Sequence, residues 1–204
     1  MRFSALTIAA ALAAASTAAM SCGYDDPAGV STIRGMLNFI YPKSLYVIPA
    51  VLQAQANNII ARDDRPAAVK VLLGYQQAVA KLGLLRDRLA IVSDDRQKPA
   101  FAIILIGPAL WTRFEPDGDG LAMMPHAEGP ARGDVVLVTE ESVISALVDG
   151  RLTAASAAEL GLIRYYGAAE SLSAAQTWLE RATQKTHASA TRSLAPTPAE
   201  VVPQ

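Results

Sequence analysis

The sequence predicts an α+β domain, in which about five mostly antiparallel strands form a sheet covered by helices, preceded by a helical N-terminal segment. Apolar residues at helical spacing indicate a long amphipathic helix from Asp64 to about Leu89. After Pro99 the pattern changes to short apolar runs separated by Gly, Pro and charged residues, which is typical of strands. The 204 residues suffice for one compact domain with tails.

The first 21 residues have the composition of a signal peptide. Met1 and Arg2 form a short positive region, Phe3 to Ala15 is apolar, and small residues fill Ser16 to Ser21. The apolar stretch is shorter than the roughly 20 residues of a membrane-spanning helix. We therefore interpret residues 1–21 as a signal peptide and expect an exported protein of the periplasm or cell envelope, with a buried N-terminal helix as the alternative.

Cys22, the only cysteine, directly follows this segment, so the domain has no intramolecular disulfide. The run from Ala19 to Cys22 resembles the bacterial lipoprotein signal, in which the cysteine becomes lipid-modified. The run departs from that signal at Ala19, where the pattern usually has Leu. Ordinary cleavage after Ala18, Ala19 or Ser21 fits equally well, and both interpretations stay open. Membrane association is expected only through a lipidated Cys22.

Two helices are predicted in the N-terminal segment, residues 22–62. The first covers Ser31 to Tyr41 and is ended by Pro42. The second starts with Pro49 in its first turn and runs to about Ala61. Its predicted apolar face consists of Leu52, Ala56, Ile59 and Ile60.

The long helix and the strands follow in the predicted domain, residues 63–186. Asp64 is the expected N-cap of the long helix, with Pro66 in its first turn. The turn from Asp117 to Gly120 has hairpin chemistry. The predicted strands, which suit an antiparallel meander, are Phe101 to Ile106, Leu110 to Glu115, Leu121 to Met124 and Asp134 to Val138.

Helical signals return after the fourth strand. Thr139 is the expected N-cap of a helix that stops at Gly150, and Thr153 that of a shorter helix closed by Gly161. The remaining predicted elements are a fifth strand at Leu162 to Tyr166, a helix from Ser173 to about Lys185 and a disordered tail at residues 187–204, rich in Ser, Thr, Ala and Pro.

Two blocks of residues within this order of elements resemble the sterol-carrier-protein domain, type two. The first is Trp111 with the turn from Asp117 to Gly120. The second contains Asp134–Thr139, Gly150-Arg151-Leu152, Ala157, Gly161, Ile163 and Gly167. The similarity covers roughly Asp64 to Lys185. The export signal is a departure from that family, and the segment from Gly23 to Arg62 has no counterpart in it.

The resemblance implies a passive function, in which sheet and helices enclose a cavity for a lipid, fatty acid or isoprenoid. The implied wall residues are Phe101, Ile103, Leu105, Trp111, Leu121, Met123, Leu147 and Trp178. The alternative is that these side chains fill a solid core. The run from Leu152 to Ile163 is also similar to the first helix of helix-turn-helix units and to a stretch of enoyl-CoA hydratases. The signal peptide argues against the former, and the latter lacks the rest of its fold.

The sequence contains no recognisable catalytic, phosphate-binding or dinucleotide-binding motif. His126 and His187 lie in a connection and in the tail, so a shared metal site is not expected. Asp117 and Asp119 lack the other ligands of a calcium loop. No cofactor, metal or catalytic residue is therefore predicted.

Two functions remain as interpretations. The first is an envelope protein that binds an apolar ligand in the carrier-like domain. The second is an accessory or structural envelope lipoprotein that binds a partner protein through residues 23–62, where Tyr24, Tyr41 and Tyr46 would suit an interface. With 18 basic and 19 acidic residues, the chain lacks the strong positive field that nucleic-acid binding requires.

Overall fold

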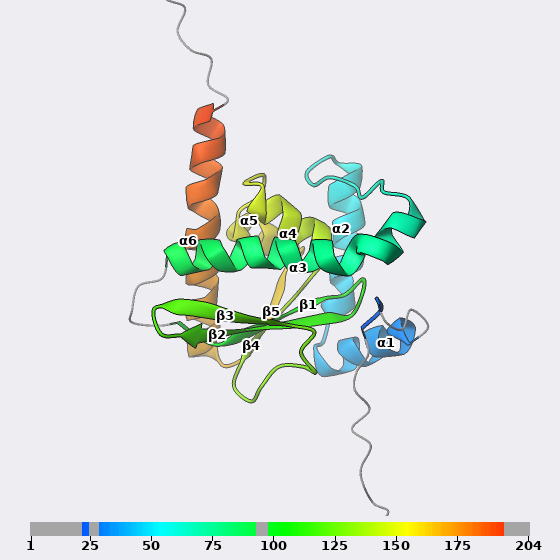
Figure 1. Cartoon of the computed structure of the whole chain (residues 1–204), viewed down its shortest axis with the longest axis horizontal. Coiled ribbons are helices and arrows are strands. Elements are labelled where there is room, and N and C mark those ends of the chain that lie inside the picture. The colour runs from blue at the N-terminus through cyan, green and yellow to red at the C-terminus, as the bar shows by residue number, and fades with distance from the viewer. Residues whose placement is uncertain (1–21, 25–28, 93–97, 194–204) are drawn as a thin grey trace, which may run out of the picture.

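The computed structural model describes residues 22–24, 29–92 and 98–193, so the predicted signal peptide lies outside the described residues. The elements confirm the α+β class and the five strands (Figure 1). They are α1 (Val30–Ile40), the 3-10 helix η1 (Ser44–Tyr46), α2 (Val47–Ala56), α3 (Ala67–Ile91), β1 (Phe101–Leu105), β2 (Leu110–Asp117), β3 (Gly120–Pro125), β4 (Val135–Thr139), α4 (Glu141–Val148), α5 (Ala154–Glu159), β5 (Arg164–Tyr166) and α6 (Ala169–Ser193).

The sheet has the strand order β3-β2-β1-β4-β5, with β1 in the centre. β1 pairs antiparallel with β2 and parallel with β4, so Phe101 has both Phe114 and Val135 as partners. The predicted meander is therefore wrong at the fourth strand, although the sheet is mostly antiparallel as predicted. Every residue of β1 and of β4 is buried, the pattern of strands covered on both faces, and this coverage favours their parallel pairing in the middle of the sheet.

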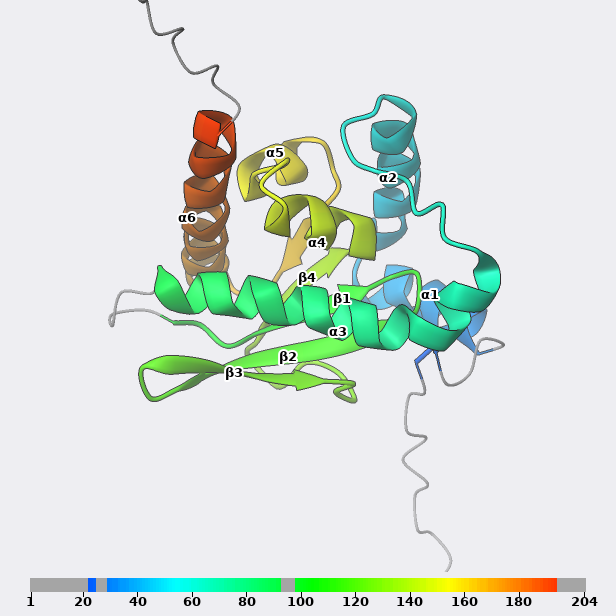
Figure 2. The same cartoon turned by 45° about the horizontal axis from the view of Figure 1, so that its top comes forward.

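Helices cover the sheet face that bears Phe101. Its ring stacks on Phe114, with centroids 4.7 Å apart, and meets Trp178 of α6 edge-on at 5.9 Å. The indole Nε1 of Trp178 donates a 2.9 Å hydrogen bond to the Leu89 carbonyl of α3. In both views α3 runs between the β2–β3 hairpin and the pair α4 and α5 (Figures 1 and 2).

The opposite face is covered partly by the N-terminal segment. The ring of Tyr41 lies 6.0 Å from Trp111 and 5.1 Å from Tyr166. The hydroxyl of Tyr166 donates a 2.8 Å hydrogen bond to the Pro42 carbonyl. Leu37 of α1 belongs to the same buried cluster as the strands. The N-terminal segment is therefore part of the core of this fold.

Two predicted helix boundaries are wrong for local reasons. Pro66 has an extended backbone, with φ −55° and ψ 144°, so α3 begins after it and Asp64 is not its N-cap. α2 ends at Ala56 because Asn58 adopts a left-handed conformation, with φ 57°. The predicted apolar face of α2 is also wrong, since Val47, Val51 and Ala54 are buried and Leu52 is exposed.

Thr139 was predicted as a helix N-cap, but it is the last residue of β4. Its hydroxyl donates a 2.9 Å hydrogen bond to the Leu162 carbonyl, and Glu140 is the N-cap residue of α4. The prediction at Thr153 is confirmed, because its hydroxyl accepts a hydrogen bond from the Ser156 N–H. α6 extends to Ser193, so the first part of the predicted disordered tail is helical, and residues 194–204 lie outside the described part of the chain.

The central strand generates the first prediction. Ile104 of β1 is fully buried between β2 and β4, so Ile104→Ala leaves a cavity that the neighbouring strands cannot fill. We expect the free energy of unfolding to fall by about 2–5 kcal/mol, measured by urea unfolding. Ile91→Ala is the matched control, because Ile91 is 76% exposed, and it should change stability by less than about 1 kcal/mol. Equal effects of the two substitutions would contradict the assignment of β1 as the core strand.

Candidate functional site

A cleft of about 900 Å³ lies between α2 and the N-terminal parts of α3 and α4. In both views α2 stands beside α4, at the end of the molecule away from α6 (Figures 1 and 2). The turn after β1 contributes Gly107 and Pro108, and the chain near the N-terminus contributes Gly23 and Tyr24. We call this feature the α2 cleft. Its volume is within the range of small-molecule sites, about 300–1,000 Å³.

One wall of the α2 cleft is apolar. It is formed by Ile48, Val51 and Leu52 of α2, and Ala61 and Pro108 extend it. Leu52 is 61% exposed, although a leucine on a short helix could have faced the core. Apolar surface left open beside a concavity is available to an apolar ligand.

The rest of the lining is polar, with five basic residues against three acidic ones. Four of the basic residues form ion pairs: Arg65 and Lys70 with Asp63, and Lys81 and Arg151 with Asp149. Arg62 is the exception, since it makes no hydrogen bond or ion pair within the part of the chain that the structure describes. The cleft therefore combines an apolar wall with one cation that has no internal partner there.

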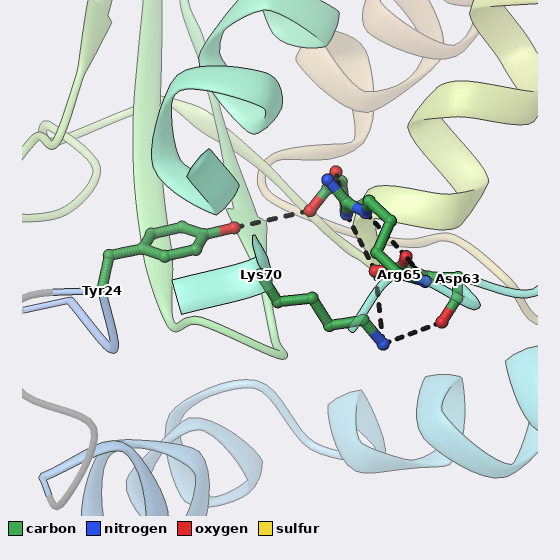
Figure 3. A network of polar contacts seen from close by, with 5 residues as sticks. Tyr24, Asp63, Arg65 and Lys70 are labelled. Carbon is green, nitrogen blue, oxygen red and sulfur yellow. Dashed lines mark hydrogen bonds and ion pairs between the residues drawn. The ribbon is translucent and has the colours of Figure 1, made fainter. Parts of the chain in front are cut away.

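A network of polar contacts joins three separate segments at the cleft (Figure 3). The Arg65 guanidinium contacts Asp63 at 2.7 Å and Glu141 of α4 at 3.2 Å, and Lys70 Nζ lies 3.6 Å from Asp63. The Tyr24 hydroxyl donates to Glu141 over 3.4 Å. The hydrogen bond from Arg65 lowers the pKa of Asp63 to about 2, while burial, followed by the charge of Glu141, raises the pKa of Tyr24.

Gly74 is needed for this arrangement because the Tyr24 ring lies directly on α3. A methyl group added at Gly74 would come within 2.5 Å of Tyr24 Cε1. We call residues 22–24 the strap. Besides the Tyr24 side chain, its backbone also contacts the domain, since the Gly23 N–H donates a 2.5 Å hydrogen bond to the Pro108 carbonyl. The strap therefore forms one end of the cleft lining.

Glu140 is an acidic residue of the cleft lining whose carboxylate contacts the backbone of the turn after β1. Its Oε2 accepts a 3.1 Å hydrogen bond from the Gly107 N–H, and Arg34 donates to the carbonyls of Ile106 and Gly107. Burial raises the pKa of Glu140 to about 7, although the Gly107 hydrogen bond and the Arg34 charge oppose this shift. Its proton can therefore exchange near neutral pH, and no histidine is among the residues that line the cleft.

The eight predicted apolar-ligand residues lie elsewhere. Seven of them come together under the helices, on or facing the Phe101 face of the sheet, while Trp111 lies on the opposite face against Tyr41. All except Met123 are buried, and none of the eight lines the α2 cleft. Their role as a ligand wall stays a prediction. The seven are Phe101, Ile103, Leu105, Leu121, Met123, Leu147 and Trp178.

Cys22, the predicted lipidation site, is 2% exposed and belongs to the core cluster. A diacylglyceryl group on its sulfur would have to displace it from this position, because a lipid cannot be accommodated among buried side chains. The three tyrosines of the predicted partner interface are also separated: Tyr24 lines the cleft, Tyr41 packs on Trp111 and Tyr46 is exposed.

Sequence reasoning missed Arg62, Arg65 and Glu141 as parts of one site. Arg65 and Glu141 are 76 positions apart, and no motif connects them. The one feature of the sequence that could have indicated the cleft is Leu52. It is an apolar residue of α2, and the opposite side of this short helix is apolar as well.

Comparisons with known proteins do not assign the chain to a family. No family model, no curated protein and no solved structure matches the chain. Within the described ranges, no helix is long and apolar enough to cross a membrane, and no group of three or more His, Cys, Asp or Glu side chains could hold a metal ion.

The raised pKa of Glu140 generates a prediction for stability against pH. The folded state binds the proton more tightly than the unfolded chain, whose value is near 4.5, so stability is lost as pH rises from 4.5 to about 7. We expect Glu140→Gln to reduce this loss by about 3 kcal/mol, measured by urea unfolding at several pH values. Glu170→Gln, on the exposed start of α6, is the matched control. An unchanged pH profile in Glu140→Gln would contradict the assignment.

Proposed function

We propose that the chain binds an amphiphilic ligand, with an apolar tail and one anionic head group, in the α2 cleft. A fatty acid, or a lipid or isoprenoid with a carboxylate or phosphate head, has this chemistry. The observation that carries the proposal is the division of the cleft between an apolar α2 wall and a basic rim, in which Arg62 has no partner among the described residues.

The energetics favour an amphiphile over a purely polar ligand. Each methylene group buried against Ile48, Val51 and Leu52 would contribute about 0.8 kcal/mol. Arg62 is exposed, so its charge would contribute less to affinity than the tail does. It would mainly orient the head group, because a guanidinium binds a carboxylate or phosphate with two hydrogen bonds.

The resemblance to the sterol-carrier-like domain supports the same ligand class, although it implied a wall in the core of the sheet. The predicted signal peptide would place this activity in the periplasm or at the cell envelope. The proposed function is binding of a ligand, without a chemical step.

The tail site is tested with Leu52→Asp in the full-length chain. A dansyl-labelled undecanoic acid is titrated and its fluorescence gives the dissociation constant. We expect binding to weaken about tenfold or more, because a charge replaces apolar surface where the tail would lie. Leu84→Asp is the matched control, since Leu84 is also exposed but lies outside the cleft. Equal affinities of the two variants would overturn the proposed site.

The head group is tested with Arg62→Glu and two probes. We expect this variant to weaken binding of the dansyl fatty acid several-fold and to leave binding of its methyl ester unchanged, because the ester carries no charge. Arg86→Glu, on the exposed side of α3 away from the cleft, should bind both probes as the unaltered protein does. A parallel loss for acid and ester would show that Arg62 does not contact the head group.

A further inference from the structure

The first helix has an apolar face that none of the described residues covers. Met36 and Ile40 are more than half exposed, and Phe39 is 90% exposed. Val30 and Leu37 bury the other side of α1, so this helix is apolar beyond the stripe that the core uses. Tyr46 of η1, 62% exposed, follows in the chain. We call Met36, Phe39, Ile40 and Tyr46 the α1 face.

The segment around the α1 face has an unusual charge pattern. Residues 29–62 contain no Asp or Glu, and they contain three basic residues, Arg34, Lys43 and Arg62. Arg34 is engaged with the carbonyls of Ile106 and Gly107, which attaches α1 to the turn after β1. Lys43 and Arg62 are exposed. Apolar and aromatic side chains with the exposed cation Lys43 between α1 and Tyr46, and with no acidic residue from 29 to 62, match the chemistry of an anionic lipid surface.

The described part of the chain also begins at this place. Gly23 packs against Val30, the first residue of α1, so the residues that precede Cys22 connect to the domain beside α1. Those preceding residues include the apolar stretch from Phe3 to Ala15. Because we interpret that stretch as part of a signal peptide, the N-terminus of the exported chain would lie beside the exposed apolar helix.

We propose that the α1 face lies in the interface of an anionic lipid bilayer. The helix would bury Phe39 and its neighbours at the boundary of head groups and acyl chains without crossing the membrane. α1 is connected through η1 to α2, so docking would keep the apolar wall of the α2 cleft close to the bilayer. The inference goes beyond the proposed function and does not depend on it, because the α1 face would dock whether or not the cleft is filled.

A position-specific probe tests this in the full-length chain, because the N-terminal apolar stretch could itself retain the protein on vesicles. Phe39→Trp places an indole on the α1 face. With equimolar phosphatidylglycerol and phosphatidylcholine vesicles, we expect the added emission to shift to shorter wavelength and brominated acyl chains to quench it. Ile91→Trp is the matched control, since Ile91 is also highly exposed but lies at the far end of α3, and its emission should not respond.

Two further measurements sharpen the result. Replacing phosphatidylglycerol by phosphatidylcholine, or Lys43 by Glu, should reduce the quenching several-fold, because the attraction is partly electrostatic. The triple substitution of Met36, Phe39 and Ile40 by Ser should abolish insertion of the Tyr46→Trp probe while leaving the urea unfolding midpoint unchanged, since these side chains are outside the core.

Some results would overturn the proposal. An unshifted and unquenched Phe39→Trp emission in vesicle-bound protein would show that another part of the chain holds the membrane. A shift without vesicles that grows with protein concentration would show that a second copy of the chain covers the face. A shift that appears only with an added envelope protein fraction would assign the face to a protein partner.

Discussion

The burial of β1 on both faces is the constraint on which the rest of this structure depends. A central strand composed of Phe, Ala, Ile and Leu must be covered on two sides, because any exposed side would leave apolar surface in water. α3 and α6 cover one side through Trp178. The N-terminal segment covers part of the other through Tyr41 on Trp111, and so a region that resembled a separate extension belongs to the core.

The same constraint produces the α2 cleft. Once α1 and η1 are packed on the sheet, α2 continues away from them and meets α3 and α4 only across a gap that its own short apolar side chains do not fill. The loop after α2 returns to α4 through Arg65 and Glu141, which bridges the cleft without closing it. A gap bounded by a rigid core and crossed by one ion-paired loop can admit a ligand with little rearrangement.

The proposed ligand and the proposed membrane surface both involve residues 29–62. This stretch has no acidic residue, and it supplies most of the apolar cleft wall, the exposed Phe39, and Arg62, which has no partner among the described residues. If both proposals hold, the short α1–η1–α2 connection keeps the binding wall and the docking face adjacent in the chain. In the core under the helices, by contrast, side chains pack against one another, as the stack of Phe101 on Phe114 illustrates.

The sequence by itself determined the features that depend on neighbours along the chain. The period of apolar residues predicted α3, the Asp117–Gly120 turn predicted the β2–β3 hairpin, and the Thr153 cap is formed as expected, because these signals act over a few residues. Only the tertiary structure decided that β4 lies parallel to β1, or that Arg65 meets Glu141. Those pairings join segments far apart in the chain, and their free energy comes from burial that no local pattern records.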